Sequence, residues 1–218
     1  MTPSGSDAVR PWDARLARRL VAPWKDSWVR PNHLTTLRLL VGLAAAAAFV
    51  PGTYGWSNLA ALLLALSNFL DHTDGELARI SGASTRLGHL YDLASDAVVT
   101  VLVFIAIGLG VGATSRLGLP LPPAVLGAIA GSAIALIFYF RMRIEDRVGK
   151  VGTAQASVAG FETEDVLYLL PLMTLCNAMT PALIAASLVT PLFAVWVVID
   201  YRRRMHRREV LTVQSSSS

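Results

Sequence analysis

Four aspartates stand in the stretch DHTDGELARISGASTRLGHLYDLASD, which runs from Asp71 to Asp96, and they lie inside two otherwise apolar segments. A carboxylate inside a membrane span is costly unless it is paired, binds a metal ion or faces a wet cavity. On a helix, Asp71 and Asp74 are i, i+3 neighbours. Asp92 and Asp96 are i, i+4 neighbours, so each pair shares one helix face. A glycine-containing turn at residues 81–83 separates the two helices and places both pairs about 10–15 Å from the same membrane face. Four carboxylates at one depth predict a divalent-metal site.

The ligand types in this stretch suit a hard cation. Mg²⁺ prefers oxygen ligands, and the stretch offers carboxylates. The single cysteine, Cys176, provides no partner for a zinc site of the His/Cys type. His72 and His89 lie in the same stretch and could act as general bases on chemical grounds. We expect Mg²⁺ or Mn²⁺ as the cofactor.

The spacing of these residues carries a family resemblance. It resembles, position for position, the signature of the CDP-alcohol phosphotransferases, which are integral membrane enzymes of phospholipid synthesis: Asp71-x2-Asp74-Gly75-x2-Ala78-Arg79-x8-Gly88-x3-Asp92-x3-Asp96. The match consists of eight fixed residues with fixed gaps, which leaves little room for chance.

The resemblance implies a role for each residue of the signature. The first three aspartates would hold two metal ions on the diphosphate of a CDP-linked donor. Asp96 would both touch metal and take the proton from the acceptor hydroxyl, so it is the expected catalytic residue. The remaining positions would bind the donor, with small residues leaving room for the nucleotide and the arginine meeting phosphate oxygens: Gly75, Ala78, Gly88 and Arg79. A homodimer is also implied.

Two further donor contacts are expected where the first span begins, in RPNHLTTLR (residues 30–38). Asn32 is a good helix N-cap. Many members of the resembled family begin their first span with a similar Pro-Asn-x2-Thr-x2-Arg pattern beside the nucleotide, which makes Asn32 and Thr35 candidates. The alternative is a plain helix start in which Arg38 extends its side chain toward the membrane surface.

Basic residues at and after the end of the fourth apolar segment could bind a phosphate-bearing acceptor or donor phosphates: Arg141, Arg143, Arg147 and Lys150. The alternative is that these charges only orient the protein in the membrane. Three acids come next, and they could favour a helix dipole or bind an amino or polyhydroxy acceptor: Glu162, Glu164 and Asp165. Glu76 is expected to point away from the Asp71–Asp74 face, toward lipid headgroups or a neighbouring loop. Gly127 and Gly131 would allow close helix packing, within the chain or in a dimer.

Composition predicts the elements that must position this site. The chain has 218 residues, 54% of them hydrophobic, and a mean hydropathy of +0.52, which excludes an ordinary soluble domain. We expect an all-α polytopic membrane protein with an interfacial amphipathic helix at 11–30, where tryptophans alternate with basic residues. Six transmembrane segments are expected at about 33–50, 57–80, 86–112, 122–143, 165–180 and 182–201.

The predicted domain organisation is a disordered N-terminus (1–10), the interfacial helix (11–30), one catalytic membrane domain (31–205), and a basic then disordered tail (206–218). With the N-terminus inside, all but Arg116 of the 19 Lys and Arg residues fall on the inner side. The positive-inside rule then places both termini and the site in the cytoplasm. A bacterial inner membrane is expected, with membrane lipids and no nucleic acid as partners.

The sequence therefore predicts a transferase that moves a phosphate-linked group from a CDP-alcohol to a hydroxyl and releases CMP. CDP-diacylglycerol is the favoured donor, and a CDP-linked polar alcohol is the alternative. Three other functions fit the sequence less well. A prenyltransferase usually has two separated Asp-rich motifs and more spans. A cation transporter would need acids in the outer halves of its spans. A catalytically silent scaffold would not need the complete motif.

Overall fold

The structure is a computed structural model that describes residues 12–25, 27–82, 85–114, 118, 121–148 and 169–216, with the backbone alone at 12–15, 145–148 and 206–216. This part of the chain is all helical and holds no strand, which confirms the predicted all-α class. Its elements are α1 (Trp12–Val21), the short 3₁₀ helix η1 (Ala22–Trp24), α2 (Pro31–Phe49), α3 (Tyr54–Ser81), α4 (Arg86–Thr114), α5 (Pro123–Val148), α6 (Leu170–Leu175) and α7 (Met179–Ser216).

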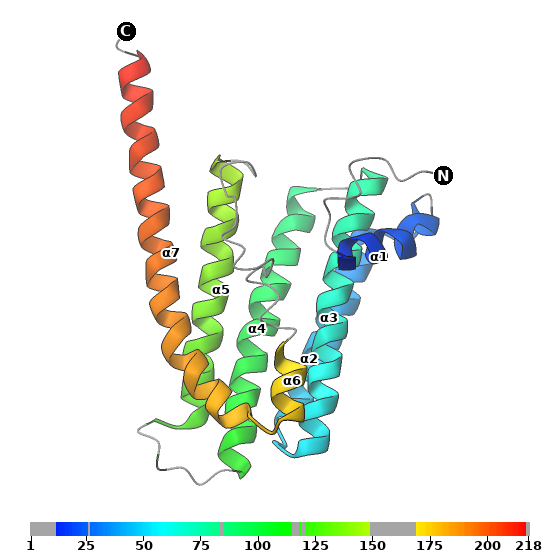
Figure 1. The fold of residues 1–218 in the computed structure, drawn as a ribbon. Helices are drawn as coiled ribbons and strands as arrows, with labels where there is room; N and C mark the ends of the chain where they lie inside the picture. The colour runs from blue at the N-terminus through cyan, green and yellow to red at the C-terminus, as the bar shows by residue number, and fades with distance from the viewer. Residues whose placement is uncertain are drawn as a thin grey trace.

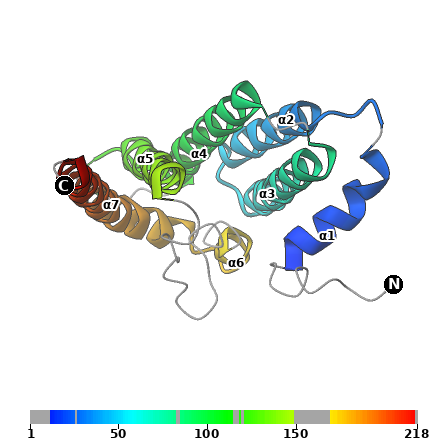
Figure 2. The ribbon, with the colours of Figure 1, turned by 90° about the horizontal axis from the view of Figure 1, so that it is seen from above.

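The long helices run up and down beside one another, as Figure 1 shows. The start of α2, the end of α3, the start of α4 and the ends of α5 and α7 lie at one end of the bundle, and α1 lies across α3 at this same end (Figure 1). In the view along the bundle, the order of neighbouring helices is α1, α3, α2, α4, α5 and α7, and α6 lies next to α3 (Figure 2). All residues of the aspartate signature are therefore on α3 and α4, and α2 packs against both of these helices.

Four helices of the described part are long and apolar enough to cross a membrane: Pro31–Phe49, Arg86–Thr114, Pro123–Ile144 and Met179–Met205. The 28-residue α3 is not among them because its polar residues, Asp71 and Asp74 included, lower its hydropathy. The predicted number of six spans stays a prediction.

The fifth predicted segment, 165–180, is described only from residue 169 onward. Its described residues form a six-residue helix, α6, which at about 1.5 Å per residue is far shorter than a bilayer. The chain then turns at Asn177, whose φ of 52° is left-handed, and α7 begins at Met179. The turn at Asn177 ends the segment earlier than hydropathy predicts.

The ends of the chain also differ in extent from the prediction. α1 ends at Val21 and gives way to η1, where Pro23 lacks the backbone N–H that a continuing helix needs. The helix expected over 11–30 is therefore shorter. At the other end α7 continues to Ser216, past the predicted boundary at 205, since neither glycine nor proline interrupts residues 192–216. Residues 1–10 lie outside the described part.

Close contact between α4 and α5 depends on glycine. A Cβ added at Gly127 would lie 2.0 Å from the carbonyl oxygen of Phe104, and one at Gly131 would lie 2.9 Å from the Cα of Val101. Both glycines are used for packing within the chain, which is one of the two uses that the sequence allowed. This contact holds α5 against α4, the helix that carries Asp92 and Asp96.

Gly127→Ala should therefore destabilise the protein by about 1–3 kcal/mol, since the backbones of α4 and α5 must separate to admit a methyl group. Unfolding in mixed micelles with increasing SDS would measure this loss. Gly55→Ala is the matched control, because its Cβ would meet no atom within 4 Å and alanine favours a helix. Equal stability of the two variants would contradict the close packing.

Candidate active site

The hairpin of α3 and α4 positions the aspartates. α3 ends at Ser81, and Gly82 follows with a φ of 66°, a left-handed conformation that glycine adopts without strain. α4 begins at Arg86 and runs antiparallel to α3, with α2 packed between the two helices. The predicted turn is confirmed at Ser81 and Gly82, whereas Ala83 lies outside the described residues. The two aspartate pairs thus come to one depth in the bundle.

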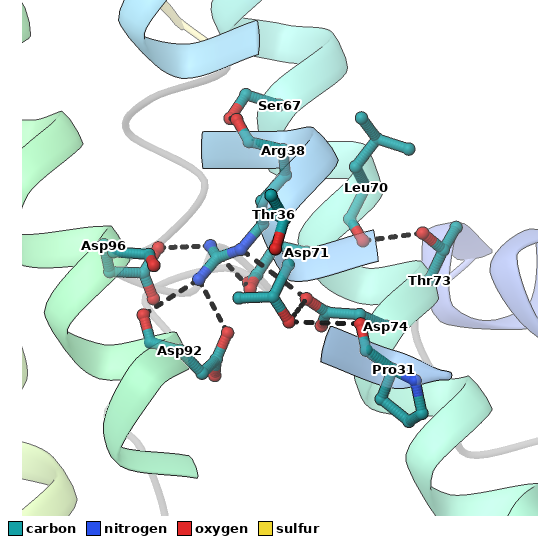
Figure 3. Close-up of polar contacts among 12 residues, drawn as sticks. Pro31, Thr36, Arg38, Ser67, Leu70, Asp71, Thr73, Asp74, Asp92 and Asp96 are labelled. Atoms are coloured by element: carbon teal, nitrogen blue, oxygen red, sulfur yellow. Dashed lines mark hydrogen bonds and ion pairs between the residues drawn. The ribbon is translucent and has the colours of Figure 1, made fainter. Parts of the chain in front are cut away.

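Arg38 of α2 lies between the two pairs, as Figure 3 shows. Its Nη1 lies 2.7 Å from Oδ1 of Asp71 and also forms an ion pair with Oδ1 of Asp96. Its Nη2 lies 2.6 Å from Oδ1 of Asp92 and donates a hydrogen bond of 2.9 Å to the carbonyl oxygen of the same residue. The guanidinium therefore connects aspartates of both helices.

This position differs from the alternative in which Arg38 extends toward the membrane surface. Its side chain is only 5% exposed, because buried carboxylates attract it more strongly than distant headgroups do. The sequence held a signal for this: four acids in an apolar stretch need a cation, and Arg38 follows Thr35 by three residues, on the same helix face.

Asp74 is the most deeply buried of the four aspartates, with a side chain 6% exposed. The hydroxyl of Thr35, itself buried, donates a hydrogen bond of 2.7 Å to its Oδ2. The Nε of Arg38 lies 3.6 Å from the same oxygen. Ser67 of α3 donates a hydrogen bond of 2.9 Å to the backbone oxygen of Arg38, which ties α2 to α3 beside the cluster.

Three of the aspartates are close enough to share a metal ion. Asp71, Asp74 and Asp92 each offer a carboxylate oxygen, and these oxygens lie within 4.8 Å of one another. Asp96 joins them through the Arg38 nitrogen that also contacts Asp71. An all-carboxylate donor set fits a hard divalent cation, so the residues fit the cofactor that the signature implies.

A cavity of about 290 Å³ adjoins the cluster. Its polar lining includes Arg38 and three of the aspartates together with His72, His89 and Arg141, while its apolar lining includes Leu64, Val99, Phe104 and Phe138. A largely apolar cavity with a few convergent polar groups is typical of a ligand site.

The expected donor-binding residues lie at the end of the bundle where α2 and α4 begin. A Cβ on Gly88 would lie 3.1 Å from Oδ1 of the exposed Asn32, so the glycine lets the two helix starts approach each other. Gly75 faces open space apart from Nη2 of Arg79, 3.9 Å from the position of an added Cβ. Ala78, which directly precedes Arg79 in the sequence, is half-buried. The hydroxyl of Thr35 bonds Asp74, and its contact with the donor stays a prediction.

Glu76 is buried, which corrects the expectation that it faces headgroups or a loop. Its side chain is 1% exposed and forms an ion pair with Arg79, whose own side chain is 60% exposed. The adjacent Leu77 packs with Val21 at the end of α1 and Leu34 of α2, so protein covers this part of α3. Helix periodicity indicates the face on which Glu76 lies, whereas the packing of α1 decides what covers it.

Of the expected acceptor residues, Arg141 lines the cavity, and its guanidinium lies 5.6 Å from the centre of the Phe193 ring. Arg143 lies over Tyr139 at 5.8 Å. The side chain of Arg147 and the other candidates lie outside the described residues: Lys150, Glu162, Glu164 and Asp165. The structure thus brings one of these basic residues to the cavity.

Thr35→Val should lower the free energy of unfolding by about 1–3 kcal/mol, since it removes a hydrogen bond to a buried carboxylate. Unfolding in SDS with mixed micelles would measure the loss, and Thr35→Ser should restore most of it. The matched control is Thr36→Val, because the exposed Thr36 hydroxyl bonds the Asn32 carbonyl oxygen and Tyr91 rather than an aspartate. A loss at Thr36 as large as at Thr35 would contradict this account.

Two known proteins resemble parts of the chain. Cholinephosphotransferase 1 of Danio rerio is 38% identical over 90 residues, covering 38% of this chain and 23% of that protein. Archaetidylinositol phosphate synthase of Pyrococcus horikoshii is 29% identical over 102 residues, covering 47% of this chain and 53% of that protein. The chain thus matches about a quarter and about half of the lengths of these relatives.

The family comparison covers most of the chain. The sequence model of the CDP-alcohol phosphatidyltransferase family matches residues 28–199, from just before α2 to near the middle of α7. The matched range includes the full aspartate signature and Arg38, and it includes helices apolar enough to make this a multi-pass membrane protein. The chain therefore belongs to the CDP-alcohol phosphatidyltransferase family.

Proposed function

We propose that this protein is a metal-dependent transferase that moves a phosphatidyl or phospho-alcohol group from a CDP-alcohol to an acceptor hydroxyl and releases CMP. One observation carries the proposal: the four aspartates of the family signature converge from α3 and α4 beside a single cavity. Membership of the family supports the same reaction class.

Asp71, Asp74 and Asp92 are the proposed metal ligands, with Asp96 as a further contact. Their carboxylate chemistry supports Mg²⁺ or Mn²⁺, and we propose two ions. When bound, the metal neutralises charge on the diphosphate and stabilises the leaving phosphate. The hydrogen bond that Thr35 donates to Oδ2 of Asp74 helps to hold this carboxylate in one position.

Asp96 is the proposed general base. Its side chain is 38% exposed, against 6% for Asp74, so a substrate hydroxyl can reach it. Asp96 accepts the acceptor's proton as the acceptor oxygen forms a bond to the phosphorus remote from cytidine. The bond from that phosphorus to the bridging oxygen breaks, and CMP leaves with the bridging oxygen, roughly in line with the attack.

The donor side of the proposal has two forms. CDP-diacylglycerol with a polar acceptor is the first, and a CDP-linked polar alcohol is the alternative. One relative is named as a cholinephosphotransferase and the other as an archaetidylinositol phosphate synthase. We propose Asn32, Gly75, Ala78, Arg79 and Gly88 for nucleotide binding, because they lie near the end of the bundle beside the cluster.

We also propose that the protein is a homodimer in a bacterial inner membrane, with the site and both termini cytoplasmic. The gathering of basic residues supports this orientation. Arg86, Arg141 and Arg202 lie on helix segments at the end of the bundle that holds the site.

The deciding experiment is CMP release by purified protein in lipid with Mg²⁺ or Mn²⁺. CDP-diacylglycerol would be supplied with glycerol 3-phosphate, inositol, inositol phosphate, serine or choline in separate reactions. CMP formed with one acceptor would establish both the class and the acceptor. Metal-dependent CDP binding without CMP release would favour a CDP-linked polar donor. Absence of CDP binding by folded protein would overturn the proposal.

Asp96→Asn should lower turnover by about 100-fold or more, since it removes the base but keeps the size of the side chain. Metal-dependent CDP binding should stay close to that of the unchanged protein. Asp71→Asn should instead weaken both metal and donor binding, as calorimetric titration would show. Normal turnover in Asp96→Asn would exclude this residue as the base.

Arg141→Gln should raise the KM for a phosphorylated acceptor by about tenfold or more, because a charge-assisted hydrogen bond to phosphate is lost. The KM for the corresponding acceptor without phosphate serves as the internal control and should change little. An equal rise for both acceptors would mean that Arg141 acts on the shape of the cavity rather than on phosphate.

A further inference from the structure

The aspartate cluster holds one cation of the chain itself. The Arg38 guanidinium contacts Asp71, Asp92 and Asp96 through its two terminal nitrogens, and its Nε faces Asp74. One positive charge thus stands among four carboxylates, so most of their negative charge is left without a counter-charge from Arg38. The cluster can hold more positive charge than this arginine supplies.

We propose that Arg38 is a built-in counter-cation that occupies the aspartate cluster until a divalent metal ion displaces it, and that it thereby limits metal affinity. The inference rests on the proposed function, because it takes the same aspartates as metal ligands. It adds a positioning residue that the family signature in α3 and α4 does not contain.

The guanidinium and a metal ion would bind the same carboxylates. Two of the three carboxylates that lie close enough to share a metal are already bonded to Arg38, through Oδ1 of Asp71 and Oδ1 of Asp92. A metal ion between these carboxylates would stand next to a positive guanidinium in a poorly solvated site, where repulsion between like charges is strong. We therefore expect the guanidinium to leave when a metal ion binds.

One of the three guanidinium nitrogens of Arg38 lacks a hydrogen bond. Its Nε is buried and makes no hydrogen bond, and the nearest carboxylate oxygen, 3.6 Å away, accepts a hydrogen bond from Thr35 instead. A buried donor without a partner is unfavourable, which lowers the cost of moving the group.

The side chain can leave without moving the backbone. Ser67 holds the carbonyl oxygen of Arg38, so α2 stays docked on α3. Arg38 itself lines the adjoining cavity, and its long, flexible side chain can turn into that space. In the absence of metal, the same arginine lowers the repulsion among the aspartates and so allows them to be buried together.

Metal affinity without substrate tests the proposal. Chelator-treated protein in lipid nanodiscs would be titrated with Mn²⁺ in the absence of CDP, with free Mn²⁺ followed by electron paramagnetic resonance. Arg38→Gln should bind Mn²⁺ about tenfold or more tightly than the unchanged protein, since the competing cation is gone. Arg38→Lys should fall in between, because it keeps the charge but loses the two-pronged contact.

Arg86→Gln is the matched control, because it removes the same charge from the exposed start of α4, six residues before Asp92. Its Mn²⁺ affinity should stay within about twofold of the unchanged protein, since exposed charges at this distance are screened. A gain there as large as in Arg38→Gln would overturn the proposal, because the effect would then reflect net charge alone.

Thermal unfolding separates a displaced cation from a purely structural arginine. Arg38→Gln should be less stable than the unchanged protein without metal, and Mn²⁺ should raise its Tm by more. Equal or weaker Mn²⁺ binding in Arg38→Gln would overturn the role of Arg38 and leave the proposed reaction standing. Absence of Mn²⁺ binding in every protein, with and without CDP, would overturn the metal site and with it both proposals.

Discussion

The burial of four carboxylates at one depth is the constraint on which this structure depends. Like charges repel at short range, and each carboxylate also loses water when helices close around it. The Arg38 guanidinium offsets both effects by contacting aspartates of α3 and α4 at once. Because Thr35, on the same helix, holds Asp74, the whole cluster relies on how α2 packs between α3 and α4.

Small residues set that docking distance. A Cβ on Gly42, one helical turn after Arg38, would lie 2.7 Å from a methyl carbon of Val99 and 3.2 Å from Oγ of Ser67. Three alanines that follow on α2 are buried: Ala45, Ala46 and Ala48. Helices in membranes associate mainly through such close packing, since lipid removes the usual hydrophobic drive. The polar contacts of Arg38 therefore depend on the close packing of these small residues of α2.

The cavity beside the cluster joins the two kinds of surface that the proposed reaction needs. Charged groups from α2, α3, α4 and α5 meet on its polar side, and its apolar side is formed by residues deeper in the bundle, such as Leu64 and Phe104. An amphiphilic substrate can place its phosphates near the aspartates and its apolar part among such side chains. This arrangement supports a transferase acting at the membrane surface.

The sequence by itself determined the helical class, the α3–α4 hairpin and the grouping of the aspartates, because helix periodicity and one glycine turn are local properties. It could not assign Arg38 to the cluster, since the contacts join residues far apart in the sequence, up to 58 positions, and depend on helix docking. Helix packing likewise decided the burial of Glu76. Tertiary structure alone pairs distant charges, because a buried charge takes whichever partner the packing brings near.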